Sequence, residues 1–285
     1  MNAIDLVGLL RDQLVSIPSE TIMLFGVALL MSGRGFYQTV YFISTGYGFS
    51  IAGMALLSMF IFRQNLAWYS LLHLMLLAAY GLRLGIYLVR REFQPSYRKE
   101  LKSVQERSSG ISFMQNVLIW IGVSILYVLM FSPALFSLVN PPMRLSPLAV
   151  VSQVVGLLFM TGGLAIETLA DQQKSAFKAK FPNQFCNIGL YGWVRCPNYL
   201  GEILFWIGNW VMGLIFYTSI LRWIAGLVGL ICIVLIMIGS TKRLERAQFD
   251  RYDLLPEYQK YIQTVPVLFP FVPVYTLKNV RVYLE

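Results

Sequence analysis

The chain has 285 residues, of which 57% are hydrophobic and 13% are charged, with a formal net charge of +9. Soluble domains carry about a quarter charged residues, so this composition excludes an ordinary soluble domain. The apolar runs are long enough to cross a hydrocarbon core, which takes about 20 residues per helix, and this length favours helices over barrel strands. The sequence therefore predicts an all-α, polytopic membrane protein.

Seven transmembrane helices are predicted, and the whole chain, 1–285, is expected to form one integral-membrane domain. The first predicted helix is the least regular, because Gly33-Arg34-Gly35 interrupts it. In chain order the predicted spans are 20–43, 46–62, 66–89, 111–138, 147–170, 199–218 and 221–241.

Most lysines and arginines lie in three segments: 90–110, 171–199 and the tail after residue 241. With seven spans, all three segments fall on one side of the membrane. The positive-inside rule then places the C-terminus in the cytoplasm and the N-terminus outside.

Polar side chains recur at helical spacing, which places them along single helix faces. Ionisable residues within spans are candidates for a functional site, and for those near the cytoplasmic boundary lipid-headgroup contact is the alternative. The four stripes are Tyr69, His73, Tyr80, Arg83 and Tyr87; Glu167, Asp171, Lys174 and Lys178; Asn198, Glu202 and Asn209; and Arg243, Arg246 and Asp250.

No metal centre is expected. His73 is the single histidine, which argues against a multi-histidine metal site. The three cysteines, at 186, 196 and 232, lack C-x-x-C spacing and predict neither a disulfide framework nor a metal site.

Residues 189–202 concentrate polar groups directly before an apolar run. They include the cation of Arg195, the amide of Asn198 and the carboxylate of Glu202. Pro197 suits the first position of a helix, whose free backbone N–H groups would then lie beside Arg195. A helix N-terminus next to an arginine suits a phosphate or another anion, so we expect an anionic ligand at this membrane edge.

The segment Gly-Leu-Tyr-Gly-Trp-Val-Arg-Cys-Pro-Asn-Tyr-Leu-Gly-Glu (189–202) resembles the signature of the membrane steroid 5α-reductase superfamily, which includes bacterial members and the sterol C14-reductases. The stretch 167–174, the tail between Leu244 and Phe271, and Tyr80-Gly-Leu-Arg83 resemble further motifs of that superfamily. The resemblance is strongest over 160–271. It implies a seven-helix fold, NADPH held at the cytoplasmic face, and hydride transfer to the C=C bond of a hydrophobic enone, steroid or related lipid.

The resemblance also implies roles for single residues. Tyr80 would donate a hydrogen bond to the substrate carbonyl as charge builds on its oxygen. Arg83 and Glu167 would lie with the cofactor-binding residues. The nucleotide would be held by Asp171, Arg195, Asn198, Tyr199 and Glu202, with Lys178, Arg243, Arg246 and Tyr258 near its phosphates and adenosine.

One element of the steroid enzymes is missing. They carry a Gln-Glu pair in the second span, whereas residues 46–62 here contain no acid and no amide. Tyr80 would then polarise the carbonyl with another partner, for which we expect His73.

Two other functions are compatible with these motifs. An S-adenosylmethionine-dependent membrane methyltransferase of the isoprenylcysteine carboxyl type has a similar Arg-x-Pro-x-Tyr-x-Gly element, and a non-catalytic lipid-binding or transport protein also carries charges within its spans. The expected partners are a hydrophobic small molecule and membrane lipids, with no nucleic acid. The expected location is a bacterial inner membrane, or the endoplasmic reticulum membrane of a eukaryote.

Overall fold

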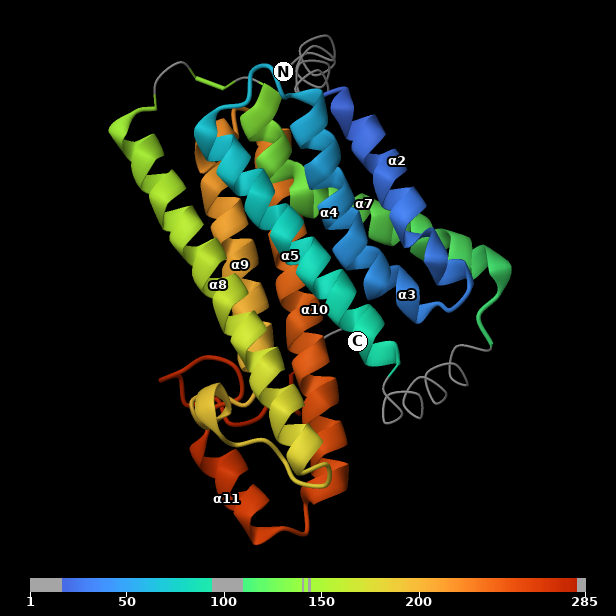
Figure 1. Ribbon diagram of the computed structural model, residues 1–285, viewed down its shortest axis with the longest axis vertical. Coiled ribbons are helices and arrows are strands. Elements are labelled where there is room, and N and C mark those ends of the chain that lie inside the picture. The colour runs from blue at the N-terminus through green and yellow to red at the C-terminus, as the bar shows by residue number, and fades with distance from the viewer. Residues whose placement is uncertain (1–16, 94–109, 140, 143–144, 281–285) are drawn as a thin grey trace, which may run out of the picture. The chain divides into compact units, whose positions relative to one another are not determined.

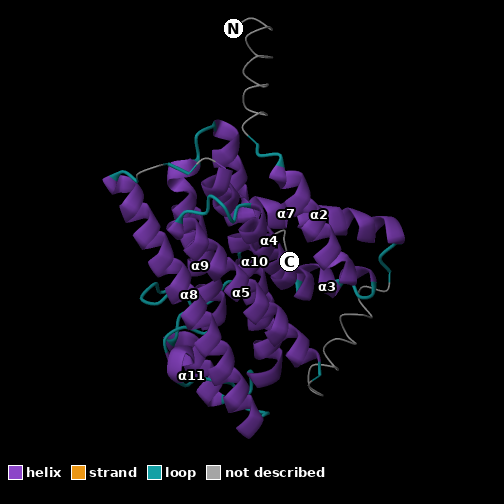
Figure 2. Cartoon of the chain, turned by 45° about the horizontal axis from the view of Figure 1, so that its top comes forward, coloured by secondary structure: helices purple, strands orange, loops and turns teal. Residues whose placement is uncertain are grey.

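The structure, a computed structural model, describes residues 17–93, 110–139, 141–142 and 145–280. The chain divides into two compact units. Unit 1 comprises residues 1–154 and 210–229, and unit 2 comprises 155–209 and 230–285. The regular elements among the described residues are all helices, joined by loops (Figure 2).

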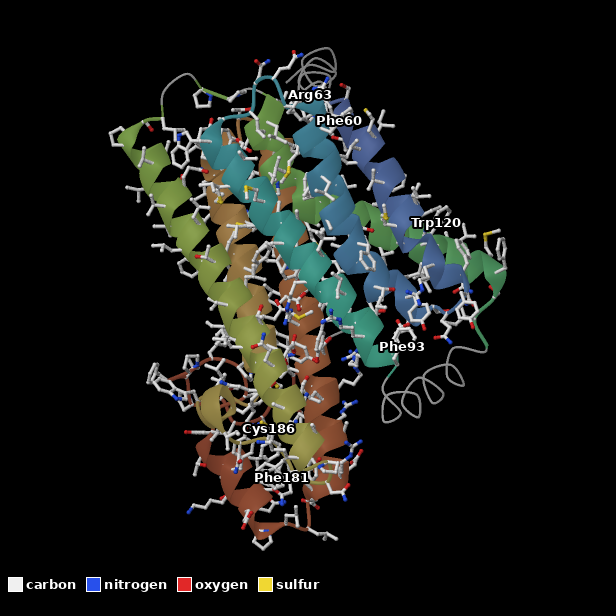
Figure 3. All side chains as sticks on the ribbon, in the orientation of Figure 1. Phe60, Arg63, Phe93, Trp120, Phe181 and Cys186 are labelled. Atoms are coloured by element: carbon white, nitrogen blue, oxygen red, sulfur yellow. The ribbon has the colours of Figure 1, made fainter. Side chains whose placement is uncertain are left out.

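Unit 1 contains three neighbouring helices, α2 (Glu20–Ser32), α4 (Thr45–Ile61) and α5 (Trp68–Glu92), together with the short α3 (Val40–Ile43) and the long α7 (Phe113–Val139). Helix α4 packs between α2 and α5 (Figure 1). The indole N–H of Trp120 on α7, labelled in Figure 3, donates a hydrogen bond of 2.9 Å to the carbonyl of Leu29 and so joins α7 to α2.

Glycines let α4 and α5 approach until their backbones touch. A Cβ atom added at Gly81 would lie 2.4 Å from the carbonyl oxygen of Gly48, and one added at Gly48 would lie 2.9 Å from the amide nitrogen of Gly85. Gly81 and Gly85 form a G-x-x-x-G motif, which is typical of close helix pairs in membranes. This crossing fixes where the polar face of α5 lies against α4.

Three long helices contribute to both units: α8 (Pro147–Lys180), α9 (Pro197–Gly213) and α10 (Ile220–Tyr252). Unit 2 also contains the 3₁₀ turn η2 (Gly189–Gly192), between α8 and α9, and helix α11 (Pro256–Thr264), which follows α10. Phe181, labelled in Figure 3, comes directly after α8. Cys186, also labelled there, follows five residues later and packs with Phe177 and Tyr191.

A second pair of glycine contacts joins α8 and α9 within unit 2. Cβ atoms added at Gly201 and Gly208 would lie 2.6 Å from the carbonyl oxygens of Gly163 and Gly156, respectively. The residue number rises along one helix as it falls along the other, so the two helices run antiparallel. Both contacts recur after seven residues, which is two helical turns.

Five of the described helices are long and apolar enough to cross a membrane: α5, α7, α8, α9 extended by the 3₁₀ turn η3 (Leu214–Phe216), and α10. Helix α4 is also apolar but has only 17 residues. The chain is therefore a multi-pass integral membrane protein, as its composition predicts.

One predicted span is wrong. The expected span 20–43 is not one helix, because α2 ends at Ser32 and the 3₁₀ turn η1 (Gly33–Phe36) follows. Gly35 lies against the ring of Phe42, where a Cβ atom would clash, so the chain folds back at this point. Helices α8 and α10 continue past the predicted membrane spans 147–170 and 221–241, as the helical spacing of their charged residues predicts. Residues 94–109 of the first basic segment lie outside the described residues.

Candidate functional site

Helix α9 begins at Pro197, as the sequence predicts. The two residues before it are hydrogen-bonded to the part of the tail that follows α11, residues 265–280. The backbone N–H of Arg195 donates to the carbonyl of Pro266 at 2.9 Å, and that of Cys196 donates to the carbonyl of Val267 at 3.0 Å. The tail therefore returns to the start of α9, where Figure 1 shows the red C-terminal segment beside the turn that precedes this helix.

The side chain of Arg195 forms a buried ion pair. Its Nη2 atom lies 3.2 Å from Oε1 of Glu245 on α10, and both side chains are almost completely buried. The same nitrogen donates to the carbonyl of Tyr275, while Oε2 of Glu245 accepts from the N–H of Leu277 at 3.0 Å. The Arg195–Glu245 ion pair thus fixes residues 275–277 to the signature segment (189–202) and to α10.

A cavity of about 380 Å³ opens beside this ion pair. The Tyr258 side chain in its wall is fully buried, and its hydroxyl has no hydrogen-bond partner among the described residues. Burial raises the pKa of Tyr258 to about 12, so the group is a neutral phenol at physiological pH. The residues lining the cavity are Arg195, Glu245, Phe249, Tyr258, Ile262, Gln263, Tyr275, Thr276 and Lys278.

The predicted acids and amide of α8 and α9 lie where these helices cross. A Cβ atom added at Gly201 would be 2.7 Å from the backbone nitrogen of Glu167. Glu202 is the next residue after Gly201, so Glu167 and Glu202 belong to the same helix contact. Both glutamates are buried, as is Asp171, one turn beyond Glu167 on α8. The antiparallel pairing brings Glu167 level with the first turn of α9, where the Oδ1 atom of Asn198 is buried without a hydrogen-bond partner among the described residues.

The remaining predicted residues of unit 2 lie outside the cavity lining. Tyr199 is half-buried in the first turn of α9, and Arg243 and Arg246 are exposed on α10. Lys178 donates to the carbonyls of Pro182 and Gln184 and, at 2.7 Å, to the hydroxyl of Tyr252. Lys178 therefore closes the loop after α8 onto α10, a structural contact that its helical spacing does not indicate.

Tyr80, His73 and Arg83 belong to unit 1. Tyr80 and His73 are buried on one face of α5, as predicted, and Arg83 is half-buried with its guanidinium 5.6 Å from the ring centroid of Tyr87. The hydroxyl of Tyr80 lies 2.8 Å from that of Tyr47 on α4. His73 precedes Tyr80 by two helical turns, about 10.5 Å along the axis. Tyr47 is a hydrogen-bonding neighbour of Tyr80 that the sequence does not indicate.

Three residues of these sites are absent from the predicted set. Tyr47 gives no periodic signal in the first turn of α4, whereas Glu245 and Gln173 lie inside the tail and 167–174 motifs. The Oε1 atom of Gln173 accepts from the N–H of Leu190 at 2.9 Å. That contact holds the turn at Gly189, whose φ of +59° favours glycine.

Comparison with known proteins identifies a family but gives no activity. A stretch of 75 residues, 25% of this chain, is 36% identical to an uncharacterised protein of Schizosaccharomyces pombe, and it spans 20% of that protein's length. No solved structure matches the chain. The profile of the family described as "Protein of unknown function (DUF1295)" matches residues 35–265, and the chain belongs to that family.

Proposed function

We propose that the protein is an NADPH-dependent membrane reductase that transfers hydride to the C=C bond of a hydrophobic enone, steroid or related lipid. The observation that carries this proposal is the buried hydroxyl of Tyr258, which has no hydrogen-bond partner among the described residues and lies in the wall of a cavity shared with Arg195 and Lys278. A buried hydroxyl without a partner costs about 1–3 kcal/mol, and a ligand that accepts its hydrogen bond removes that cost.

The cavity has the size and lining of a nucleotide subsite. Ligand pockets typically span about 300–1,000 Å³, so a cavity of about 380 Å³ suits one half of a dinucleotide. Phe249 and Ile262 offer apolar contacts for a purine, and the cations of Arg195 and Lys278 suit phosphate oxygens. NADPH, when bound, supplies the hydride.

The polar residues of the α8–α9 crossing would hold the rest of this cofactor. An ionised carboxylate only accepts hydrogen bonds, so Glu167, Asp171 and Glu202 suit the hydroxyl groups of a ribose. The buried Oδ1 atom of Asn198 is a further acceptor. This set of acceptors would recognise the sugar, while the cavity would recognise the phosphate and base.

Tyr80 is the residue we assign to the substrate carbonyl. A neutral phenol in an apolar bundle can donate to an enone oxygen as negative charge develops there during conjugate addition. Tyr47, whose hydroxyl is 2.8 Å away, would orient the Tyr80 hydroxyl in place of the missing Gln-Glu pair. His73 shares the same helix face and would line the approach to Tyr80.

Ligand-dependent thermal stabilisation of the purified protein tests the nucleotide assignment. We expect NADPH to raise the melting temperature and S-adenosylmethionine to leave it unchanged, with Asn198→Ala and Glu202→Gln abolishing the NADPH shift. Tyr258→Phe removes a hydroxyl that bonds to nothing in the described protein, so it should weaken NADPH about tenfold without lowering the melting temperature of the free protein.

Tyr37→Phe, at a tyrosine that is 79% exposed, is the matched control and should leave the NADPH shift intact. Stabilisation by S-adenosylmethionine alone would instead identify a methyltransferase. Absence of a shift with either compound would favour a lipid-binding protein. NADPH oxidation on addition of a panel of enone lipids then identifies the substrate.

A further inference from the structure

Two large aromatic side chains of unit 2 project away from the protein next to each other. Trp193 is 66% exposed and Phe271 is 89% exposed. Their rings meet edge to face, with centroids 6.4 Å apart. We call this pair the aromatic ridge. Side chains of this size are rarely left in water together, so the ridge requires a partner.

The ridge lies where α9 begins. Trp193 precedes Pro197 by four residues, and Phe271 follows Val267 by four, with Val267 hydrogen-bonded to the N–H of Cys196. Helix α9 with its 3₁₀ extension has 20 residues, which matches the thickness of a hydrocarbon core. The start of this span therefore falls at the membrane boundary, and the ridge lies at the same level.

The backbone at Phe271 is in a strained conformation, which requires a compensating interaction. Its φ is +65°, in the left-handed region that disfavours an L side chain. Such strain persists only where other interactions compensate for it. A phenyl ring exposed to water does not offset this strain, whereas burial of the same ring in an apolar phase is favourable and does offset it.

The segment that carries Phe271 is suited to a layer of low water content. Pro266, Pro270 and Pro273 have no N–H group that would require a partner there. The N–H of Val267 donates to the carbonyl of Val274 at 2.9 Å, and that of Val274 donates to the carbonyl of Val272 at 2.7 Å. These features lower the cost of removing this backbone from water.

We propose that the aromatic ridge inserts into the boundary between the headgroups and acyl chains of the bilayer and anchors the tail over the start of α9. Tryptophan and other aromatic rings are enriched at that depth. A hollow of about 370 Å³ beside the ridge, walled by Trp193, Phe271 and the three prolines among others, would receive part of a lipid molecule. This placement holds whatever reaction the protein catalyses.

Spin-label accessibility tests the insertion directly, with the full chain in vesicles of phosphatidylcholine and phosphatidylglycerol. Cys232, the half-buried cysteine of α10, is replaced by alanine, while Cys186 and Cys196 are buried and stay. Nitroxide labels are then placed by Phe271→Cys, by Val228→Cys on the apolar surface of α10, and by Lys260→Cys on the exposed face of α11.

We expect the labels at 271 and 228 to collide more often with oxygen than with a water-soluble nickel chelate, and the label at 260 to show the reverse. Trp193→Cys gives an independent reading of the same ridge if the first variant folds poorly. A label at 271 that behaves like the label at 260 would overturn the proposal. Spin–spin broadening at 271 would also overturn it, because the ridge would then contact a second copy of the chain.

Discussion

Glu245 lies 3.2 Å from Arg195, although fifty positions separate the two residues in sequence. Both side chains are buried, and each also binds the tail, Arg195 through the carbonyl of Tyr275 and Glu245 through the N–H of Leu277. The ion pair is therefore the point at which the signature segment, α10 and the tail meet.

Glu245→Gln should destabilise the protein strongly. It leaves the guanidinium of Arg195 buried without its counter-charge, which typically costs about 3–5 kcal/mol. The unfolding free energy in mild detergent measures this loss. The control Glu257→Gln removes an exposed carboxylate and should change stability by less than about 0.5 kcal/mol. Equal stability of the two variants would mean that the ion pair contributes nothing.

Gly81→Ala should loosen the α4–α5 pair. The new methyl group would lie 2.4 Å from the carbonyl oxygen of Gly48, so the helices must separate, at a cost of about 1–3 kcal/mol. Gly122→Ala on α7 is the control, because no atom lies within 4 Å of the added Cβ. Thermal unfolding should show a loss for the first variant and no loss, or a small gain, for the second. A similar melting temperature for both would contradict the close crossing.

Gly201→Ala should abolish the NADPH-dependent shift. Its methyl group would lie 2.7 Å from the backbone nitrogen of Glu167, so α9 must move and the carboxylates of Glu167 and Glu202 change their spacing. Gly162→Ala, one residue from the contact on α8, meets nothing within 4 Å and should bind NADPH normally. Normal binding by both variants would show that the crossing does not position these acids.

Tyr80→Phe should lower the rate of NADPH oxidation with an enone about 100-fold, since loss of one donor to a developing oxyanion typically has this effect. The NADPH-dependent thermal shift should remain, because Tyr80 is assigned to the substrate. Tyr37→Phe, at an exposed tyrosine, is the control for rate. Loss of nucleotide binding in Tyr80→Phe would mean that this residue has another role.

The raised pKa of Tyr258 predicts that the protein loses stability at alkaline pH. Its pKa is raised from 10 in the unfolded chain to about 12 in the folded protein, so the unfolded state loses its proton first. The contribution of this phenol to stability is therefore fully present below pH 10 and is lost between pH 10 and about 12. In that window the melting temperature of the native protein should fall more steeply than that of Tyr258→Phe. Parallel curves would contradict the shifted pKa.

Local patterns in the sequence predict local features well. Pro197 marks the start of α9 because its ring fits the first turn and its missing N–H is not needed there. The spacing of His73 and Tyr80 predicts one buried face of α5 because helical periodicity alone determines it. The break in the first predicted span is visible at Gly33 and Gly35, but the fold-back depends on the packing of Phe42, which no local pattern reports.

Partners that are distant in sequence could not be predicted in the same way. Tyr47 meets Tyr80 because glycines draw α4 against α5, and Glu245 meets Arg195 because α10 passes beside the signature segment. Each pairing depends on how two helices dock. The positions of Arg243, Arg246 and Lys178 illustrate the converse, since charges on a predicted stripe lie at the surface or in a loop contact. The pattern identifies which residues are polar, but docking decides what they bind.

The two glycine contacts between α8 and α9 have an evolutionary consequence. They set the alignment of these helices at two points, so neither helix can slide or rotate without a steric clash. Inserting or deleting one residue between Gly163 and Glu167 would turn the carboxylate by about 100° around the helix axis. Substitutions at outward-facing positions should therefore be common among homologues in this stretch, whereas changes in its length should be almost absent.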